Sequence, residues 1–599
     1  MSIIVQKFGG TSVANSQKIL AAARKAIRAQ QEGHQVVMVV SAMGKNTDLL
    51  IDLASQVNDR PPARELDMLL STGEQVSVAL MAMAIDSLGH RAVSLTGGQI
   101  GIRTDSTHTK ARIKSISTDR MQRLLDAGNI VIAAGFQGID EDFNITTLGR
   151  GGSDTTAVAL AAVLNAQACE IYTDVDGVYT TDPRVVPEAR RVNHISYDEM
   201  LELASLGAGV MHSRSIEFAK KYNVAIHVRS SMTDTNGTMI VADSESIDQP
   251  VCGAAMTKNE ARVSVIGVPD VPGTSFEIFS RIADRKISVD MIVQNVSEEG
   301  FTDISFTVPK DELRSTLEAV QEAAAKVGAK QITHDDSVSK ISVVGLGMAR
   351  QSGVADRMFR ALAEAGINIQ MITTSEIKIS VLVHRDEAQQ ALRLVHKAFS
   401  LEQAPAPVST ESQPAKPGQP VERPRTDAAD VVSRLQGVDM EDLVITSVEL
   451  DAEQATITIH GVPDTPGVAA NVFEQVAAAG IFVDMIVQSY DGREGEASLS
   501  FTVRREDCEA SLAAAKKLAA EYSCKAVVSN PAVAKLSVSG VGLRSHTGVA
   551  IRMFRALAAA GINVEMINTS EVRVNVIVEE GQGERAVAEL RSAFHDVLR

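Results

Sequence analysis

The chain has 599 residues, of which 45% are hydrophobic, and it carries a formal net charge of −17. This length exceeds what one hydrophobic core can hold and predicts roughly three to five domains. The negative charge argues against nucleic acid or an anionic membrane surface as the main partner and favours an enzyme that acts on small molecules.

The cysteines and the amino terminus indicate the compartment. Cys169, Cys252, Cys508 and Cys524 are scattered without CxxC spacing, which argues against a zinc site or a disulfide framework. The amino terminus lacks the basic and apolar regions of a signal peptide, and no run approaches the ~18 consecutive apolar residues of a membrane span. We therefore expect a cytoplasmic protein with no membrane or nucleic-acid partner.

Residues 1–245 alternate short apolar runs with longer helical segments. This alternation predicts an α/β domain with an open, mostly parallel sheet sandwiched by helices. In such sheets the ligand lies beyond the carboxyl ends of the strands. The expected strands are 3–8, 35–40, 92–95, 129–134, 170–173 and 224–228, and the helices between them include 63–88 and 153–164.

A lysine and two glycines follow the first expected strand, in the stretch Lys7-Phe8-Gly9-Gly10-Thr11-Ser12. Glycines there let the backbone approach a ligand, and free N–H groups at a helix start favour anions such as phosphate. The lysine would add positive charge to a transferring phosphoryl group. An ordinary turn with a surface lysine explains these six residues equally well, so the assignment depends on the rest of the chain.

The residues after 260 contain a duplication. Gly-Val-Pro-Asp-Val-Pro-Gly at 267–273 returns as Gly-Val-Pro-Asp-Thr-Pro-Gly at 461–467, and Arg-Met-Phe-Arg-Ala-Leu-Ala at 357–363 returns at 552–558. Each copy divides again, because Ile-Ser-Val-Asp-Met-Ile at 287–292 is similar to Ile-Asn-Ile-Gln-Met-Ile at 367–372. We expect four ferredoxin-like βαββαβ modules, at 260–335, 336–400, 441–530 and 531–599, with a proline-rich linker over 401–440.

Five ordered motifs together resemble the aspartate kinase family. They are residues 7–12, Ser41-Ala42-Met43, Ser71-Thr72-Gly73-Glu74, Gly149-Arg150-Gly151-Gly152-Ser153-Asp154, and 173–184. That family joins an amino-acid-kinase domain, here 1–245, to ACT modules, here four. The resemblance implies transfer of the ATP γ-phosphate, with Mg²⁺, to the side-chain carboxylate of L-aspartate. The product would be 4-phospho-L-aspartate, at the first step of lysine, threonine and methionine biosynthesis.

The resemblance also implies roles for individual residues. Catalysis would involve Lys7, which stabilises the transferring group, Gly9 and Gly10, which supply backbone donors, and Asp154, which positions Lys7. Glu74 would bind the substrate ammonium and Arg150 its α-carboxylate, with hydrogen bonds from Ser41, Thr47 and Ser153. The nucleotide side would be lined by Lys7, Gly10, Thr173, Asp174, Tyr179, Asp182 and Arg184. No metal-ligating residues are assigned.

The residue types suit this chemistry, although each has a purely structural explanation. A carboxylate nucleophile is already ionised, so positioning and charge neutralisation must carry the catalysis. Arg150 offers a planar fork for a carboxylate. Taken alone, however, Glu74 is better explained as a solvated helical face, and Asp154 could serve a helix dipole and Ser153 an N-cap.

The nucleotide side departs from the family pattern. Related kinases often place a lysine near the Ser-Ser at the end of a strand, whereas here Ser230-Ser231 is followed by Met232. Whether Lys258 takes that place is left open. No Walker-type GxxxxGK[ST] occurs, and Gly345-Leu346-Gly347 and Gly540-Val541-Gly542 lack the third glycine of a dinucleotide fingerprint.

The resemblance implies that lysine and threonine bind between paired ACT modules and inhibit the kinase, and that the protein is a homodimer. The Asp-x-Pro-Gly loops precede helices whose free N–H groups suit a carboxylate, and the alternative is that these loops are only turns. Pairing within or between chains is left open. The expected regulatory residues are Asp270, Gly273, Asp290, Ser352, Gly353, Asn368, Asp464, Gly467, Asp484, Thr547, Gly548 and Asn563.

Two other functions compete with this one. One is a different amino-acid kinase, acting on glutamate, acetylglutamate or a nucleotide. An acetylated amine, however, would have no use for Glu74. The other is a non-catalytic amino-acid sensor built on an inactive kinase domain, against which the presence of Lys7, Asp154 and the glycines argues.

Overall fold

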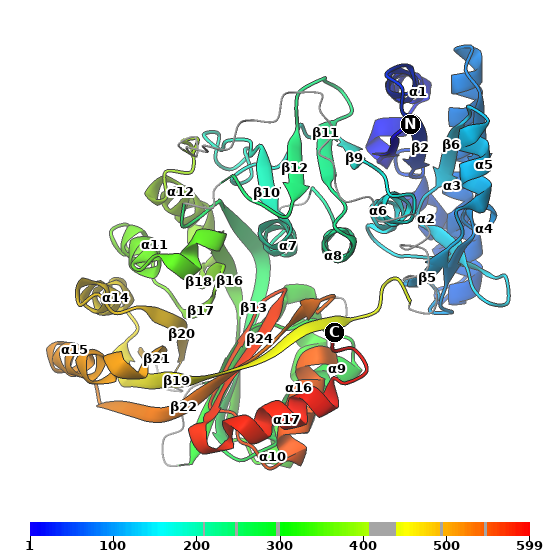
Figure 1. The fold of residues 1–599 in the computed structure, drawn as a ribbon. Coiled ribbons are helices and arrows are strands. Elements are labelled where there is room, and N and C mark those ends of the chain that lie inside the picture. Colours follow the sequence, from blue (N-terminus) through cyan, green and yellow to red (C-terminus); the bar gives the residue numbers. More distant parts are fainter. Residues whose placement is uncertain (208–209, 246–248, 295–299, 406–438, 491–494, 544–547) are drawn as a thin grey trace.

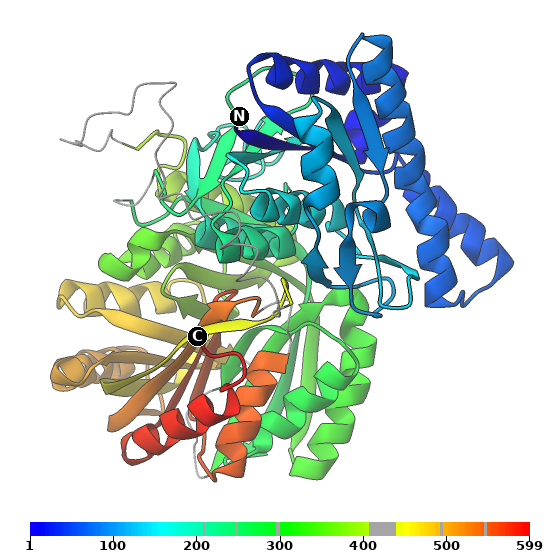
Figure 2. The ribbon, with the colours of Figure 1, turned by 45° about the vertical axis from the view of Figure 1, so that its right-hand side comes forward.

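The structure is a computed structural model, and it describes residues 1–207, 210–245, 249–294, 300–405, 439–490, 495–543 and 548–599. The amino-terminal region packs against a second region built on one long sheet (Figures 1 and 2). The elements of the first region are β1 (Ile3–Phe8), α1 (Ser16–Gln31), β2 (Gln35–Val40), α2 (Asn46–Val57), α3 (Ala63–Ser87), β3 (Ala92–Leu95), α4 (Gly97–Ile100), β4 (Ile102–Thr104), β5 (Ile113–Ile116), α5 (Asp119–Asp126), β6 (Ile130–Ala134), β7 (Gln137–Ile139), β8 (Ile145–Thr147), α6 (Gly152–Val163), β9 (Ala168–Thr173), β10 (His194–Ser196), α7 (Tyr197–Ser205), α8 (Ser213–Tyr222), β11 (Ile226–Ser230) and β12 (Thr238–Val241).

The first region is organised around an eight-stranded sheet of order β10-β12-β11-β9-β1-β2-β6-β3. Its pairings are parallel except for β11 with β12. The expected strands are therefore present, with ends that differ from the expectation by at most two residues. The remaining four strands of this region form a smaller sheet of order β5-β4-β7-β8.

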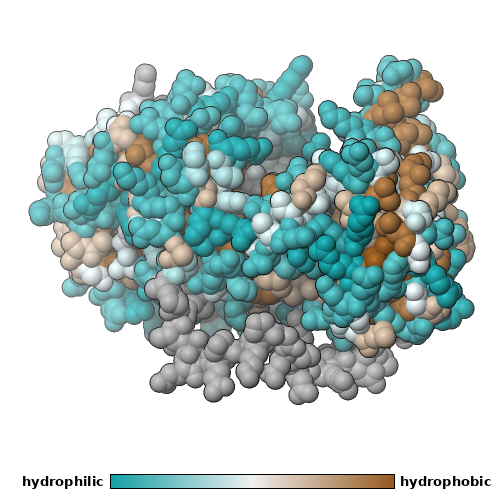
Figure 3. All heavy atoms as spheres, turned by 90° about the horizontal axis from the view of Figure 1, so that it is seen from above, coloured by the Kyte–Doolittle hydropathy of each residue, from teal (hydrophilic) through white to brown (hydrophobic). Residues whose placement is uncertain are grey.

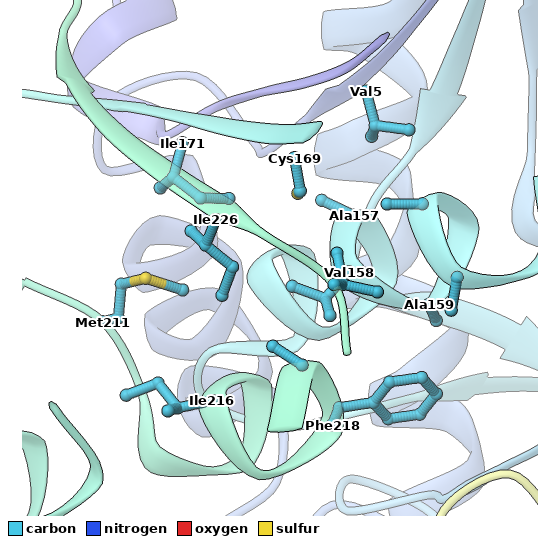
Figure 4. Close-up of a cluster of buried hydrophobic side chains, with 14 of the residues drawn as sticks. Val5, Ala157, Val158, Ala159, Cys169, Ile171, Met211, Ile216, Phe218 and Ile226 are labelled. Atoms are coloured by element: carbon cyan, nitrogen blue, oxygen red, sulfur yellow. The ribbon is translucent and has the colours of Figure 1, made fainter. Parts of the chain in front are cut away.

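Alternating side chains of the central strands pack into two separate cores. Val37 and Val39 of β2 point to the α6 side, whereas Val36 and Met38 point to the α1 and α3 side. This period of two explains why the strand is apolar throughout, since both faces of the sheet are covered. Figure 4 shows part of the first core, where residues of α6 and α8 lie against β1, β9 and β11.

Helix α3 is, within the described ranges, the one helix whose length and composition would allow it to cross a membrane. One face carries the buried Asp67 and Glu74 and packs inside the first region, so the length and apolar composition of α3 are explained by its place in the fold. The opposite side leaves apolar residues exposed, and hydrophobic atoms gather at the right-hand edge of Figure 3, on the side where Figure 1 places α3. The exposed set, with its neighbours on α2, is Leu49, Ile51, Leu53, Val57, Met68, Val76, Leu80 and Met83.

The second region holds β13 (Gly253–Pro269), α9 (Thr274–Asp284), β14 (Asp290–Gln294), β15 (Phe301–Pro309), α10 (Leu313–Val327), β16 (Gln331–Val344), α11 (Val354–Ala363), β17 (Met371–Ser375), β18 (Lys378–His384), α12 (Ala388–Ala398), β19 (Val444–Pro463), α14 (Val468–Ala478), β20 (Val483–Tyr490), β21 (Glu496–Arg504), α15 (Cys508–Glu521), β22 (Ala526–Val541), α16 (Gly548–Ala559), β23 (Met566–Thr569), β24 (Arg573–Glu579) and α17 (Gly583–Ala593). All twelve strands form one sheet, of order β14-β15-β13-β16-β18-β17-β20-β21-β19-β22-β24-β23.

The strand limits differ from those expected for separate modules. Residues 260–266 of β13 pair with β15 and with the first part of β16, but residues 253–257 pair with Lys340–Val344 at the other end of β16. The segment expected as the module 336–400 thus receives its fourth strand from before residue 260, and residues 401–405 after α12 form no strand. Strand β19 is shared with β22 in the same way. One long strand serving two units leaves no signal in the local sequence pattern.

The two copies of the duplication pack against each other within one chain. Ile372 of β17 pairs with Gln488 of β20, and Phe359 of α11 lies 5.6 Å from Phe473 of α14, ring centre to ring centre. On the other side, Phe279 of α9 lies 5.9 Å from Phe554 of α16. The second unit of the first copy therefore pairs with the first unit of the second copy, and the two remaining units pair with each other. Of the expected linker 401–440, residues 406–438 lie outside the described residues.

Candidate active site and effector sites

Lys7 and Asp154 form an ion pair at the centre of the strand ends. Nζ of Lys7, next to last in β1, lies 2.6 Å from Oδ1 of Asp154 in the first turn of α6, and the two side chains are 11% and 13% exposed. A Cβ added to Gly9 would lie 3.5 Å from this Nζ, so the lysine amine stands directly over the glycine turn. The structure thus brings the expected catalytic lysine, carboxylate and glycine backbone together.

Gly10 is required by a close approach between two loops. A Cβ at this position would lie 2.7 Å from the carbonyl oxygen of Ala42, and the N–H of Gly44 donates to the carbonyl of Gly10 at 3.0 Å. Side chains larger than hydrogen are excluded there. This contact seats the loop that carries Ser41 on the loop that follows β1. Thr47 lies six residues after Ser41, in the first turn of α2.

Glu74 lies on the buried face of α3 and points to the same loop. Its Oε1 accepts a hydrogen bond of 3.0 Å from the N–H of Ala42, and the residue is 3% exposed. Burial raises the pKa of this carboxyl to about 7, against the lowering effect of the Ala42 N–H. Among the described residues its Oε2 has no hydrogen-bond partner. The suggestion that Glu74 belongs to a solvated helical face is therefore wrong.

The loop before α6 carries Arg150, which is exposed, between two glycines in the left-handed conformation. A Cβ at Gly151 would lie 2.3 Å from Cβ of His212, so His212 at the start of α8 packs directly on this loop. Helix α6, which follows this loop, has Gly151 as its N-cap, and no side chain donates or accepts a capping hydrogen bond there. Ser153 therefore lies inside α6 and is not the N-cap.

Asp67 is a buried carboxylate at this loop that the sequence motifs did not reveal. It lies seven residues before Glu74 on the same face of α3 and is 0% exposed. Its oxygens accept hydrogen bonds from Thr147 Oγ1 at 2.5 Å and from the N–H of Thr109 at 3.1 Å, and His108 Nδ1 lies at 2.8 Å. Thr147 ends β8, so Asp67 fixes the strand that leads into the Arg150 loop.

The expected nucleotide-side residues follow β9, beside β1. The N–H of Gly9 donates to the carbonyl of Tyr172 at 3.4 Å, which sets Thr173 next to the glycine turn. Thr173 Oγ1 donates to Asp174 at 3.2 Å. Further on, Tyr179 donates to Asp176 and does not contact the other expected residues in any described hydrogen bond.

Asp182 and Arg184 are paired with each other at 2.9 Å. The Arg184 guanidinium lowers the pKa of Asp182, with a smaller contribution from the charge of Lys258. Lys258 thus acts on the charge of an expected nucleotide-side residue. Met232, which stands where related kinases often have a lysine, is 55% exposed.

The two Asp-x-Pro-Gly loops each meet an asparagine from the other copy of the duplication. Asn563 Nδ2 donates to Asp270 Oδ1 at 2.8 Å, and Asn368 Nδ2 donates to Asp464 Oδ1 at the same distance. Gly273 and Gly467 cap the following helices with φ of 96°. The structure brings these expected regulatory residues together in two equivalent places.

Most of the other expected regulatory residues lie at two cavities. One, of about 300 Å³, is lined by Ser352, Gly353 and Asp484. The second, of about 140 Å³, is lined by Asp290 and the first turn of α16, which begins at Gly548. Thr547 lies outside the described residues. Asp290 and Asp484 each already form an ion pair with a lysine of the chain, Lys340 and Lys535 respectively.

Comparison with known proteins matches both halves of the chain. A profile of the amino acid kinase family matches residues 2–230, and ACT domain profiles match residues 262–325, 341–399, 457–518 and 536–594. An aspartate kinase of Stutzerimonas stutzeri is 52% identical over 408 residues, which are 68% of this chain and 99% of that protein.

Solved structures extend the similarity to the whole chain. The aspartate kinase of Synechocystis is 40% identical, with a TM-score of 0.52, over 99% of this chain and 98% of its own. Aspartokinase III of E. coli, solved with lysine and aspartate, shares the fold over 66% of this chain at 24% identity and a TM-score of 0.53, covering 99% of its own chain. A relative 52% identical and matched over nearly its full length is decisive, so this chain belongs to the aspartate kinase family.

Proposed function

We propose that the protein transfers the γ-phosphate of ATP to the side-chain carboxylate of L-aspartate, giving 4-phospho-L-aspartate and ADP. The observation that carries this proposal is the ion pair between Lys7 and Asp154 over the backbone of Gly9 and Gly10. A carboxylate oxygen attacks the γ-phosphorus, the bond to the bridging oxygen of ADP breaks, and no proton has to be removed. Lys7 and the N–H of Gly10 then stabilise charge on the transferring group, whereas the N–H of Gly9 donates to the Tyr172 carbonyl.

The aspartate is proposed to lie between α3 and the Arg150 loop. Glu74 suits the ammonium because one of its oxygens is fixed by Ala42 and the other has no partner among the described residues. Arg150 is exposed at the mouth of this loop and suits the α-carboxylate. Ser41, Thr47 and Ser153 supply the remaining hydrogen bonds. Asp154 positions Lys7 and the substrate amine.

The nucleotide is proposed to lie at the ends of β1 and β9, against Lys7, Gly10, Thr173, Asp174, Tyr179, Asp182 and Arg184. Within the described ranges no group of three or more His, Cys, Asp or Glu forms a metal site. Mg²⁺ would then arrive bound to phosphate oxygens, with which it neutralises charge. The charge of Lys258 contributes to the lowered pKa of Asp182, which supports a nucleotide-side role for this lysine.

The ACT region is proposed to bind end-product amino acids, lysine and threonine, and to inhibit the kinase. The proposal includes four ACT modules at the expected positions. The long strands β13 and β19 are each shared by two of these modules. Two places join Asp270 to Asn563 and Asp464 to Asn368, and two cavities lie beside Asp290 and Asp484. The enzyme would thus serve lysine, threonine and methionine biosynthesis under feedback control.

The assembly is proposed to be a cytoplasmic homodimer. The ACT units already pair within one chain, which leaves the exposed apolar face of α2 and α3 for a second copy. Neither nucleic acid nor a membrane is a proposed partner.

An acceptor panel tests the reaction. Purified protein with Mg-ATP is expected to release ADP with L-aspartate and not with L-glutamate, N-acetyl-L-glutamate or a nucleoside monophosphate. Turnover with another acceptor instead of aspartate would indicate a different amino-acid kinase. A folded protein that binds ATP and effectors but forms no ADP with any acceptor would indicate a non-catalytic amino-acid sensor.

A further inference from the structure

The residues that follow the linker attach to the kinase domain before they enter the ACT sheet. The N–H of Met440 donates to the carbonyl of Lys114 at 3.0 Å, and that of Glu441 donates to Ile113 at 3.3 Å, so the segment lies along β5. Met440 is 1% exposed and belongs to the hydrophobic core of the kinase domain. In Figure 1 the yellow chain reaches from β19 to the neighbourhood of β5. We call residues 439–442 the anchor segment.

Helix α8 holds the anchor segment from the other side. The carbonyl oxygen of Met440 accepts hydrogen bonds from Lys221 Nζ at 3.0 Å and from the Tyr222 hydroxyl at 2.9 Å. Lys221 also donates to the carbonyl of Asp442. These contacts fix the backbone on both sides of Glu441. The position of the Glu441 side chain is therefore set by the kinase domain.

Glu441 forms a buried ion pair with Arg214 in the first turn of α8. Oε2 of Glu441 accepts from both Nε and Nη2 of Arg214, at 2.9 and 2.5 Å, and the two side chains are 7% and 14% exposed. The same guanidinium donates to the carbonyls of Leu148 at 2.5 Å and Ala111 at 2.7 Å. One planar fork thus joins the anchor segment to two loops of the kinase domain.

Leu148 directly precedes the loop 149–152 that carries Arg150. The same end of α8 also packs on this loop through His212, which leaves no room for a side chain at Gly151. The start of α8 therefore supports the loop at two points, one by packing and one by the hydrogen bond from Arg214. Of these two contacts, only the hydrogen bond from Arg214 depends on a residue that follows the linker, Glu441.

We infer that Glu441 is a positioning residue for substrate binding, acting through Arg214 on the loop that presents Arg150. This rests on the proposed role of Arg150 at the substrate α-carboxylate. The carboxylate of Glu441 fixes the guanidinium of Arg214, which otherwise keeps its buried charge without a counter-ion and moves toward water. The Leu148 carbonyl then loses its donor. The carboxyl-terminal half thus completes the aspartate site in addition to carrying the effector sites.

The test replaces Glu441 by glutamine, which keeps the shape and removes the charge. Asp439→Asn is the matched control, because Asp439 is an exposed acid of the same segment. We expect Glu441→Gln to raise KM for L-aspartate by about threefold or more while KM for ATP stays near that of Asp439→Asn. The melting temperature should fall, because Arg214 loses its buried counter-ion. Arg214→Lys, which keeps the charge and removes the fork, is expected to act in the same direction.

An unchanged KM for aspartate in both variants, or an equal rise in KM for aspartate and ATP, would overturn the inference. Hydrogen exchange of the amides of residues 147–152 gives a second readout that does not depend on the substrate. Faster exchange in Glu441→Gln than in Asp439→Asn supports the positioning role even if aspartate proves not to be the acceptor. Equal exchange in the two variants would show that Glu441 does not hold the loop.

Discussion

Glu202 of α7 and Lys378 of β18 form an ion pair of 2.9 Å whose side chains are 0% and 5% exposed. The other carboxylate oxygen of Glu202 accepts a hydrogen bond of 3.0 Å from the N–H of Glu571, which lines the cavity beside Asp290. Burial opposes the charge on Lys378, yet the nearby carboxylates, Glu202 first, raise its pKa above the ordinary value. One kinase helix thus contacts units from both copies of the duplication.

Breaking this pair is expected to destabilise the protein. Lys378→Met leaves the Glu202 carboxylate buried without its cation, which costs roughly 3–5 kcal/mol. Lys397→Met, on an exposed position of α12, is the control. The measurement is the denaturant midpoint of each variant. If Lys378→Met were as stable as Lys397→Met, the buried pair would have no structural importance.

Replacing Lys7 by methionine is expected to lower kcat by two orders of magnitude or more, the typical cost of losing one transition-state charge partner. Asp154→Asn is expected to act in the same direction because Asp154 fixes Nζ of Lys7. The double variant should be hardly worse than Lys7→Met, since the two residues act as a unit. Steady-state ADP release measures all three. A kcat of Lys7→Met within about threefold of the unmodified enzyme would contradict the role of Lys7.

The pKa of Glu74, raised to about 7 by burial, predicts a pH dependence of aspartate binding. Below this pH the carboxyl is neutral and cannot pair with the substrate ammonium, so kcat/KM for aspartate should rise about tenfold between about pH 6 and 8. Glu74→Gln should be low and flat over the same range. A flat profile of the unmodified enzyme would rule out Glu74 as the ammonium partner.

The same shift has a consequence for stability. The unfolded chain loses the Glu74 proton near the ordinary value of 4.5, whereas the folded protein keeps it to about pH 7. The unfolded state therefore binds fewer protons in this window, and rising pH should reduce the contribution of Glu74 to stability. Comparing the melting temperature of Glu74→Gln with that of the unmodified protein at pH 5 and 8 measures this. The glutamine variant should gain relative stability at the higher pH.

The two asparagine–aspartate contacts predict separable effector responses. Asp464→Asn removes the carboxylate that Asn368 contacts, and Asp270→Asn does the same opposite Asn563. Each variant should raise the half-inhibitory concentration of lysine or threonine about tenfold or more, a loss of about 1.4 kcal/mol of binding. Inhibition curves with each amino acid give the answer. A parallel loss of uninhibited turnover would show that these aspartates are structural.

The sequence was most informative for features that are defined by residues close together along the chain. The strand from Ile3 to Phe8, the glycine turn and the position of Asp154 at the start of α6 all follow from apolar periodicity and motif spacing. The sharing of β13 between two units, by contrast, depends on which strands pair over long distances. Asp67 and Glu441 have ordinary sequence surroundings. Their importance comes from burial against Thr147 and Arg214, which only the folded chain creates.

The most direct test of the proposed function compares three acceptors that share a carboxylate. ADP release with Mg-ATP is measured with L-aspartate, N-acetyl-L-aspartate and succinate, each with and without lysine and threonine. If Glu74 binds the substrate ammonium and Arg150 binds its α-carboxylate, only L-aspartate should support turnover. Lysine and threonine should then reduce that turnover. Equal rates with succinate, or no turnover with aspartate in a folded sample that binds ATP, would contradict this function.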